Sequence, residues 1–421
     1  MSTSTERQIE YIDRVMPWCF AGLAVILPVA HTMTIRSIFM FLPAMLWIYK
    51  MILKREFLFL KTPMTLPVAL FAAVAVFSLF TAVSPRYTLR ELRGEMATDF
   101  LLFFLVLNNV RDKKGVDFII TGLLLGGLAN GVFSVFDYFL KGGDMFDYSI
   151  KVSGLTAGYI SYSVYLVSIM PFAVYRALES RGKERGFYIF LALLNALMLF
   201  LTHQRGALVA VFVQALLFFW FIKRWLLIAM LALAAVSVFV MPKNLLYHGD
   251  TSIDVNVMET EHYKNTINSR IALWRFTLKE ISEHPFTGIG FGRHSFSEAF
   301  SRFKGTEHWH SLNTFLNITI QLGVQGLLVF LLMLFMLARA FTRGIMRSGG
   351  PTRYLLLAFF MSMAGFFARN MFDDHYVDDN GAMFWVLMGL GVYVSFQAEK
   401  LSLNGRVPDD ARSRDNRRVY G

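Results

Sequence analysis

The sequence predicts an all-α polytopic membrane protein with about twelve transmembrane helices and one long loop outside the membrane that contains short helices. Hydrophobic residues make up 55% of the 421 residues and charged residues only 17%, whereas soluble domains carry about 25% charged residues. Apolar runs long enough to cross a bilayer recur along the chain. The runs are continuous rather than alternating, which favours helices over a β-barrel. The single cysteine, Cys19, excludes a disulfide framework.

The predicted spans fall into two sets separated by a polar loop. Nine spans lie in residues 1–241, the loop covers residues 242–313, and three more spans lie in residues 314–397. The fourth span is short, and we expect it to begin nearer Glu95. The spans are Val15–Ala30, Ser37–Ile52, Leu66–Val83, Asp99–Val110, Phe118–Leu140, Gly154–Leu178, Phe187–Thr202, Ala207–Ile222, Trp225–Met241, Thr314–Ala338, Tyr354–Phe372 and Ala382–Gln397.

The basic residues predict the orientation. Most of the 41 Lys and Arg residues fall in loops on one side if the N-terminus is cytoplasmic, as membrane insertion favours. This predicts cytoplasmic N- and C-termini and places the long loop on the outer face. The tail over residues 398–421 is polar and is expected to be a disordered cytoplasmic segment. The net charge of +11 is therefore an orientation signal, and we expect no nucleic-acid partner.

Several basic residues lie on the outer side, against this trend. Arg86, Arg90 and Arg93 are spaced to share one helix face, which suits either phosphate binding or anchoring in lipid headgroups. Arg205 sits at an outer mouth between two spans, where an arginine is costly unless it has a partner or a task; snorkelling to the interface is the alternative.

The last outer loop, ARNMFDDHYVDDNG, contains Arg369 and the acidic run from Asp373 to Asp379. Its carboxylates suit a divalent cation or sugar hydroxyls. A solvated acidic loop is the third interpretation.

The long loop is where we expect chemistry, since it is the one long stretch that hydrocarbon would exclude. It holds six of the nine histidines, His248, His262, His284, His294, His308 and His310. His308 and His310 with Glu307 suggest zinc, but no HExxH motif and no third ligand at a familiar spacing accompanies them. A histidine at the membrane boundary can instead act as a general base, because its pKa lies near the working pH.

A helix is predicted within this loop, capped by Asn268 or Ser269. It should end at Glu283–His284, because Pro285 disfavours helical geometry before it. Arg270 and Arg275 lie off the apolar stripe, which consists of Ile271, Trp274, Leu278 and Ile281.

Alternating glycines follow, at Gly288, Gly290 and Gly292. They indicate a tight backbone packed against something, not a dinucleotide fingerprint, because the spacing is wrong and no βαβ unit surrounds them. A second short helical stretch, Ser295–Phe303, leads towards the tenth span.

The pattern resembles the O-antigen ligase and O-antigen polymerase superfamily of bacterial envelope glycosyltransferases. The resemblance runs from about Leu201 to Gly326. The matching residues are Arg205-Gly206, Ser269-Arg270-Ile271-Ala272-Leu273-Trp274, His284-Pro285-Phe286-Thr287-Gly288-Ile289-Gly290-Phe291-Gly292, and His310 followed by Asn313-Thr314-Phe315-Leu316 with Gly323 and Gly326. The family often has His directly before Asn at the loop exit. Here Leu312 precedes Asn313, so the register of the catalytic histidine, His308 or His310, stays open.

The resemblance implies a ligase that moves a polysaccharide from undecaprenyl diphosphate to the outer core sugar of lipid A. The reaction would occur at the periplasmic face of the bacterial inner membrane, in the long periplasmic loop, among membrane lipids and without a cofactor or metal. Fixed positive charge suits the diphosphate leaving group, and guanidinium forks onto phosphate oxygens. We therefore assign catalytic roles to His310, Arg205 and Arg270, and substrate binding to Arg86, Arg90, Arg93, His308, Arg275, Asn313 and Arg369.

No pair of carboxylates at glycosidase spacing is evident, which favours direct displacement with inversion over a covalent intermediate. Two alternatives use the same donor, a polymerase and a protein-glycosylating ligase. A twelve-span secondary transporter is the alternative from another class, but ionisable residues within spans and repeat symmetry between halves, which transporters show, are scarce here.

Overall fold

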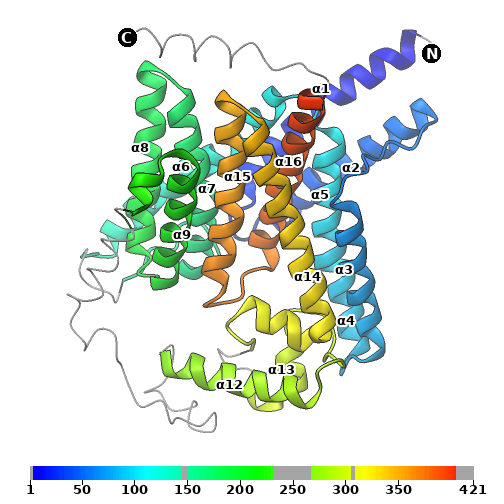
Figure 1. Cartoon of the computed structure of the whole chain (residues 1–421), viewed down its shortest axis with the longest axis vertical. Helices are drawn as coiled ribbons and strands as arrows, with labels where there is room; N and C mark the ends of the chain where they lie inside the picture. Colours follow the sequence, from blue (N-terminus) through cyan, green and yellow to red (C-terminus); the bar gives the residue numbers. More distant parts are fainter. Residues whose placement is uncertain (1–2, 145–149, 229, 231–266, 305–308, 404–421) are drawn as a thin grey trace.

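The computed structural model describes residues 3–144, 150–228, 230, 267–304 and 309–403. Every regular element among these residues is helical, which confirms the predicted class (Figure 1). The elements are α1 (Thr3–Ile26), α2 (Met33–Lys54), α3 (Thr65–Phe77), η1 (Ser78–Phe80), α4 (Pro85–Glu91), η2 (Leu92–Met96), α5 (Ala97–Asn109), α6 (Lys113–Leu140), α7 (Tyr159–Glu179), α8 (Gly182–Leu201), α9 (Arg205–Ile222), α12 (Ile267–Glu283), α13 (Ser295–Ala299), η5 (Ser301–Phe303), α14 (Thr314–Arg347), α15 (Gly350–Asn370) and α16 (Asp378–Leu403).

Seven of the described helices are long and apolar enough to span a membrane: α2, α6, α8, α9, α14, α15 and α16. The count of twelve is not confirmed. Helices α1 and α7 are long enough to span a membrane but are not apolar enough. Helices α3 and α5 have only 13 residues each. The predicted ninth span, Trp225–Met241, lies mostly outside the described residues.

The bundle is held by three groups of helices that pack side by side. Helix α15 packs on α7 and α9, α16 packs on α5 and α14, and α1 packs on α2 and α6. The interior is aromatic: Phe330, Phe367, Tyr376 and Phe384 have ring centroids 5.2–5.8 Å apart in neighbouring pairs. Such edge-to-face contacts add to the stability that apolar burial supplies. Helices α14, α15 and α16 thereby form a fixed frame for the loop between α15 and α16.

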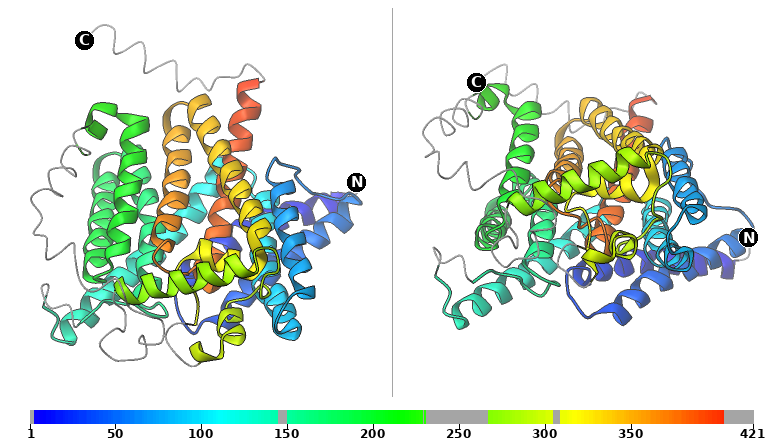
Figure 2. Two further views of the ribbon diagram at one scale, coloured as in Figure 1. Left: turned by 60° about the horizontal axis from the view of Figure 1, so that its bottom comes forward. Right: turned by 90° about the horizontal axis from the view of Figure 1, so that it is seen from below.

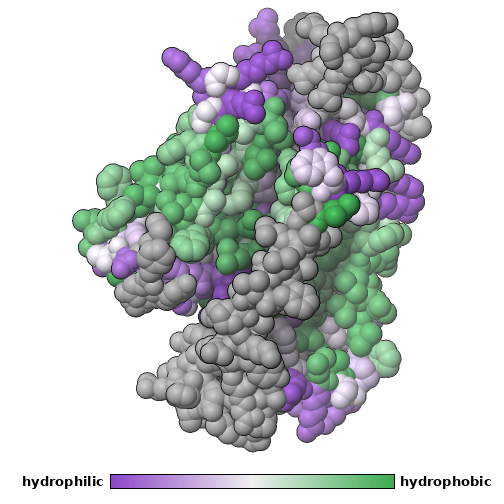
Figure 3. All heavy atoms as spheres, turned by 60° about the vertical axis from the view of Figure 1, so that its left-hand side comes forward, coloured by the Kyte–Doolittle hydropathy of each residue, from purple (hydrophilic) through white to green (hydrophobic). Residues whose placement is uncertain are grey.

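Different segments of the chain lie at the two ends of the bundle. The start of α1 and the end of α16 lie at one end, here the terminal end, while α12 and α13 lie at the other, here the loop end (Figure 1). On the face shown in Figure 3, apolar side chains cover the sides of the helices between polar ends. Helix α16 continues to Leu403, past the predicted boundary at Gln397, and the rest of the tail lies outside the described residues.

Ion pairs join separate segments of the chain at each end of the bundle. At the terminal end Lys50 binds Asp13 at 2.7 Å and Lys113 binds Glu179 at 2.8 Å, joining α1 to α2 and α6 to α7. At the loop end Arg36 pairs with Asp379, and Arg293 with Asp378. These contacts group the loops into the two sets that the basic residues predict, whereas the side of the membrane that each set faces stays a prediction.

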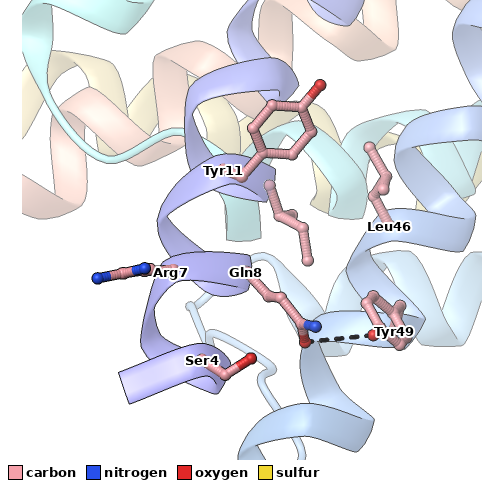
Figure 4. A pocket seen from close by; sticks show the side chains of 7 residues that line it. Ser4, Arg7, Gln8, Tyr11, Leu46 and Tyr49 are labelled. Atoms are coloured by element: carbon pink, nitrogen blue, oxygen red, sulfur yellow. Dashed lines mark hydrogen bonds between the residues drawn. The ribbon is translucent and has the colours of Figure 1, made fainter.

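An open groove of about 550 Å³ lies between α1 and α2 at the terminal end. Tyr49 donates a hydrogen bond to Gln8 across it at 3.3 Å, and the Arg7 side chain points away from Tyr49 (Figure 4). The groove lies at the opposite end of the bundle from α12, and Arg7, the cation among its lining residues, points away from Tyr49, so we assign no anionic substrate to it.

Cysteine labelling tests the orientation. In a Cys19→Ala background, Ser282→Cys, exposed at the loop end, should react with a membrane-impermeant maleimide added to intact spheroplasts. Ser402→Cys, exposed at the terminal end, should react only after the membrane is opened. The reverse pattern would contradict the positive-inside assignment.

Candidate active site

Helix α14 is interrupted at Gly323, whose φ of 73° and ψ of 177° are not helical. The break frees the carbonyls of Ile320 and Gln321, and the segment after Pro285 uses them. Ile289 N–H donates to Ile320 O at 3.0 Å and Gly290 N–H to Gln321 O at 3.1 Å, while Val324 N–H donates to Pro285 O at 2.9 Å. Unpaired backbone groups are costly in a membrane protein, so the break and the long loop stabilise each other.

The alternating glycines fit this junction, as predicted. A Cβ on Gly288 would lie 2.0 Å from Gln321 O. Gly290, with φ +101°, and Gly292, with φ +144°, adopt backbone angles that L side chains rarely adopt. They also press against Thr88 and Glu91 of the α4 region. The segment Gly288–Gly292 is therefore packed between α4 and α14. Its close contacts fix the position of these two helices relative to each other.

Helix α12 lies across the loop end of the bundle (Figure 2). It ends at Glu283, as predicted, but its described part begins at Ile267, so Asn268 and Ser269 fall inside the first turn. Ala272 and Leu273 pack on Phe296, Phe303 and Ile320.

The predicted apolar stripe of α12 is wrong at Leu278, which is 52% exposed. The face that is buried contains Ser269, Ala272, Leu273 and Thr277. These smaller residues let α12 approach α13 and α14, an interaction that periodicity of large apolar residues does not reveal.

His310 is buried at this end, 4% exposed, with a specific set of neighbours. Its Nδ1 accepts the N–H of Leu312 at 3.0 Å, so in the neutral imidazole the proton is on Nε2. Nε2 lies 3.8 Å from Asp373 Oδ1, within ion-pair range but too far for a hydrogen bond. Burial lowers the pKa of His310 to about 4, so the imidazole is neutral near pH 7.

Leu312 shows that this turn is strained. Its φ of 52° lies in the left-handed region, which a bulky residue rarely adopts. Strain of this kind tends to be retained at functional sites. The strained turn brings the N–H of Leu312 onto His310.

Asp373 is the centre of the charged cluster. Its carboxylate lies 3.8 Å from His375 Nε2 and 3.5 Å from the Arg369 guanidinium. Burial opposes ionisation, but His375, Arg369 and His310 together lower the pKa of Asp373 to about 2. Asp373 is therefore an anion that faces two neutral imidazoles and one guanidinium.

Arg369 links this cluster to the start of α9. It is 1% exposed, and it donates from Nε to Ser163 Oγ and from Nη2 to Gln204 Oε1, both at 3.1 Å. A Cβ on Gly206 would meet the Arg369 side chain at 3.5 Å. Arg369 therefore contacts the residues on both sides of Arg205.

Arg205 and Arg270 complete a group of three arginines from α9, α12 and α15. Arg205 is the exposed first residue of α9, and Arg270 is close enough to Arg369 to interact with it electrostatically. Of the three, only Arg369 has a carboxylate partner among the residues that the structure describes. The Nε of Arg270 is buried and has no hydrogen-bond partner in that part of the chain. The group therefore has more positive charge than its described neighbours neutralise.

Asn313 and Asp374 fasten the loop at the start of α14. Asn313 Oδ1 accepts the N–H groups of Phe315 and Leu316, and Asn313 Nδ2 donates to Met371 O at 2.9 Å. Asp374 accepts from Thr314 Oγ1 at 2.6 Å and from Asn317. The predicted substrate-binding Asn313 is thus placed as the N-cap of α14, which holds the His310 turn against the Asp373 loop.

The other predicted binding residues are mostly exposed, and Arg90 is linked to the His310 site through His294, on which it acts electrostatically and whose ring packs on Trp309. Arg86, Arg90 and Arg93 are exposed on α4 and η2, and Arg90 stacks on Tyr87 at 5.1 Å. Arg275 is exposed on α12, and His308 lies outside the described residues. The structure therefore brings Arg270 to Arg369 and, through Asp373, joins Arg369 to His310. Arg205 lies between two residues that adjoin Arg369.

Sequence reasoning missed Trp309 and Arg293, and it left Asp373 and His375 in a loop of undecided role. The Trp309 ring packs 4.1 Å from His310 and 4.6 Å from His294, and Arg293 covers it at 4.9 Å. The acidic run was a signal, but which of its carboxylates faces a histidine depends on how α15, α16 and the long loop meet.

The acidic loop has partners for most of its carboxylates. Asp374 binds Thr314 and Asn317, Asp378 binds Arg293, and Asp379 binds Arg36. Within the described ranges, no group of three or more His, Cys, Asp or Glu side chains is arranged to hold a metal ion.

Comparison with known proteins agrees with the resemblance drawn from the sequence. A family model described as O-antigen ligase matches residues 190–331, the stretch that contains Arg205, Arg270 and His310. No curated protein matches the chain in sequence.

Proposed function

We propose that this chain, whose residues 190–331 match a family model described as O-antigen ligase, transfers a polysaccharide from undecaprenyl diphosphate to a lipid A–core acceptor. The transfer would take place at the periplasmic face of the inner membrane, without nucleotide or metal. The observation that carries the proposal is that Asp373 faces both His310 and Arg369. Arg270 lies near Arg369, and Arg369 adjoins both chain neighbours of Arg205.

Arg205 and Arg270 are the proposed ligands of the diphosphate. Each guanidinium can fork onto two phosphate oxygens and stays charged at any working pH. Positive charge that is fixed before the reaction stabilises the diphosphate as it leaves. Arg369 is already bonded to Ser163, Gln204 and Asp373, so its proposed role is to hold Arg205 and the His310 loop in register.

His310 is the proposed base. Asp373 faces the Nε2 proton, which leaves Nδ1 as the basic nitrogen, an arrangement related to the Asp–His pair of hydrolases with the two ring nitrogens exchanged. The N–H of Leu312 now occupies Nδ1. The acceptor hydroxyl has to displace this N–H, and the strained backbone of Leu312 favours its release.

The reaction is a single displacement. The acceptor oxygen forms a bond to the anomeric carbon, the bond from that carbon to the phosphate oxygen breaks, and the hydroxyl proton passes to His310 Nδ1. The electron pair of the broken bond leaves on the diphosphate, beside the arginines. One displacement inverts the anomeric centre. Arg86, Arg90 and Arg93, exposed on α4 and η2, are the proposed outer ring that attracts phosphate groups.

Reconstitution tests the function. The purified chain in proteoliposomes should join an undecaprenyl-diphosphate-linked glycan to lipid A–core without nucleotide, and a chelator should not change the rate. Elongation of the lipid-linked glycan in place of transfer would identify the polymerase. Passage of glycan across the bilayer with no new glycosidic bond would support a transporter and overturn the proposal.

The pH dependence follows from His310. A base must be neutral, and because the pKa of His310 is lowered to about 4, the inactive protonated form accumulates only below that pH. Asp373, with its pKa lowered to about 2, stays ionised throughout. The kcat/KM for transfer should therefore be level from about pH 8 to pH 5 and fall near pH 4, whereas an ordinary histidine would give a fall near pH 6.5.

A further inference from the structure

Two side chains one turn apart on α12 have buried N–H groups without partners. They are Nε of Arg270 and Nε1 of Trp274, neither of which has a hydrogen-bond partner in the described part of the chain. Residues four apart share one helix face. A buried donor left unpaired costs free energy, so such groups in a native protein call for an explanation.

The chemistry of these groups limits what could satisfy them. Indole and guanidinium nitrogens donate hydrogen bonds and do not accept them. The missing partner is therefore an acceptor, and the oxygen atoms of phosphate and sugar groups are acceptors of this kind. The neighbouring Arg369 adds positive charge, which further favours an anionic ligand near Arg270.

Trp274 lies about one turn from Arg270 along α12, so we expect the N–H groups of the two residues to bind different acceptor atoms. Four residues advance about 6 Å along a helix. The turn between the two residues carries Ala272 and Leu273, and Leu312 packs against the cluster that they form. Leu312 is two residues from His310. The buried face of α12 and the segment that carries His310 therefore meet in one cluster, and the proposed function places the reacting sugar at this end of the bundle.

We propose that Trp274 is a donor-binding residue whose indole N–H hydrogen-bonds an oxygen of the sugar attached directly to the diphosphate. Arg270 holds the phosphate, and Trp274, one turn further along α12, orients the sugar ring whose anomeric carbon is attacked. This inference rests on the proposed function and adds to it a residue that positions the sugar of the donor.

A binding experiment on the full chain tests it. Trp274→Phe keeps an aromatic ring and removes the N–H. The two probes are undecaprenyl diphosphate and undecaprenyl diphosphate carrying one hexose, titrated calorimetrically in detergent. In Trp274→Phe the Kd for the sugar-bearing lipid should rise about tenfold, as expected for one lost hydrogen bond that leaves its acceptor unsatisfied, while the Kd for the sugar-free lipid should not change.

Two variants serve as controls. Trp220→Phe changes an exposed tryptophan on α9 that stacks with Arg224, and it should leave both Kd values unchanged. Arg270→Ala should weaken both lipids. Unchanged affinity of the sugar-free lipid in Trp274→Phe also shows that α12 is still in place.

Other outcomes overturn the inference. Wild-type affinity of Trp274→Phe for both lipids would show that the N–H makes no bond to the donor. An equal loss for both would place the contact on phosphate or in the fold. If the wild-type chain binds neither lipid, the proposed function itself fails. This result differs from the two outcomes for Trp274→Phe, in which the wild-type chain still binds both lipids.

Discussion

Replacing Arg270 by alanine should reduce glycan transfer to between about a hundredth and a thousandth of the wild-type rate, while the protein level in the membrane stays near normal. Arg270 interacts electrostatically with Arg369 and has a buried Nε without a described partner, so its removal relieves local repulsion and leaves no buried carboxylate unpaired. Loss of one preorganised donor to a developing anion costs roughly 2.7–4 kcal/mol of transition-state stabilisation, about 10²–10³ in rate. Arg205→Ala should behave alike. The measurement is initial rate of transfer in proteoliposomes.

Lysine variants separate the effect of positive charge at positions 205 and 270 from the effect of the planar guanidinium. Arg270→Lys and Arg205→Lys should restore only part of the rate, because an ammonium lacks the planar fork. Lys279→Ala, on the same helix but exposed and paired with Glu283 at 3.8 Å, is the matched control and should transfer normally. Full activity with lysine at both arginine positions would show that positive charge alone suffices.

Replacing His310 by alanine should remove transfer and retain binding of the lipid diphosphate, because the arginines remain. The variant takes away the proposed base and leaves Asp373 with Arg369 and His375 as partners. His308→Ala, which falls outside the described residues, should be milder. Transfer and undecaprenyl diphosphate binding should be measured on the same preparations.

His284→Ala is the control for His310. His284 is exposed at the end of α12 and should not affect the reaction. Transfer by His310→Ala at the wild-type rate would exclude it as the base. Loss of activity on chelation, restored by zinc, would point instead to a metal site that includes His308 and His310.

The sequence predicted the helical class, the end of α12 and the tight packing of Gly288, Gly290 and Gly292, because each depends on local chemistry. Hydrophobic runs report membrane helices, Pro285 ends a helix, and alternating glycines report close backbone contact. The structure also brings Arg369 close to Arg270 and, through Asp373, to His310. Their roles stay predictions.

The remaining features depend on contacts between distant segments. The break at Gly323 is stable because a loop residue some thirty positions earlier, Ile289, supplies its N–H to Ile320 O. The pairing of His310 with Asp373 needs the start of α14 to lie beside the end of α15. Helix α12 fully buries Ala272 and Leu273, which lie off its predicted stripe, and exposes Leu278 of that stripe, because α13 and α14 pack on the face that carries Ala272 and Leu273. None of these contacts leaves a periodic pattern in the sequence.

The most direct test of the account is a structure of the full chain with undecaprenyl diphosphate bound. The account predicts that the diphosphate lies among Arg205, Arg270 and Arg369 at the loop end, with its oxygens within hydrogen-bond distance of Arg205 and Arg270 and with His310 nearby. A diphosphate bound elsewhere, on the exposed arginines of α4 alone or in the groove between α1 and α2, with Arg205 and Arg270 free of it, would contradict the account.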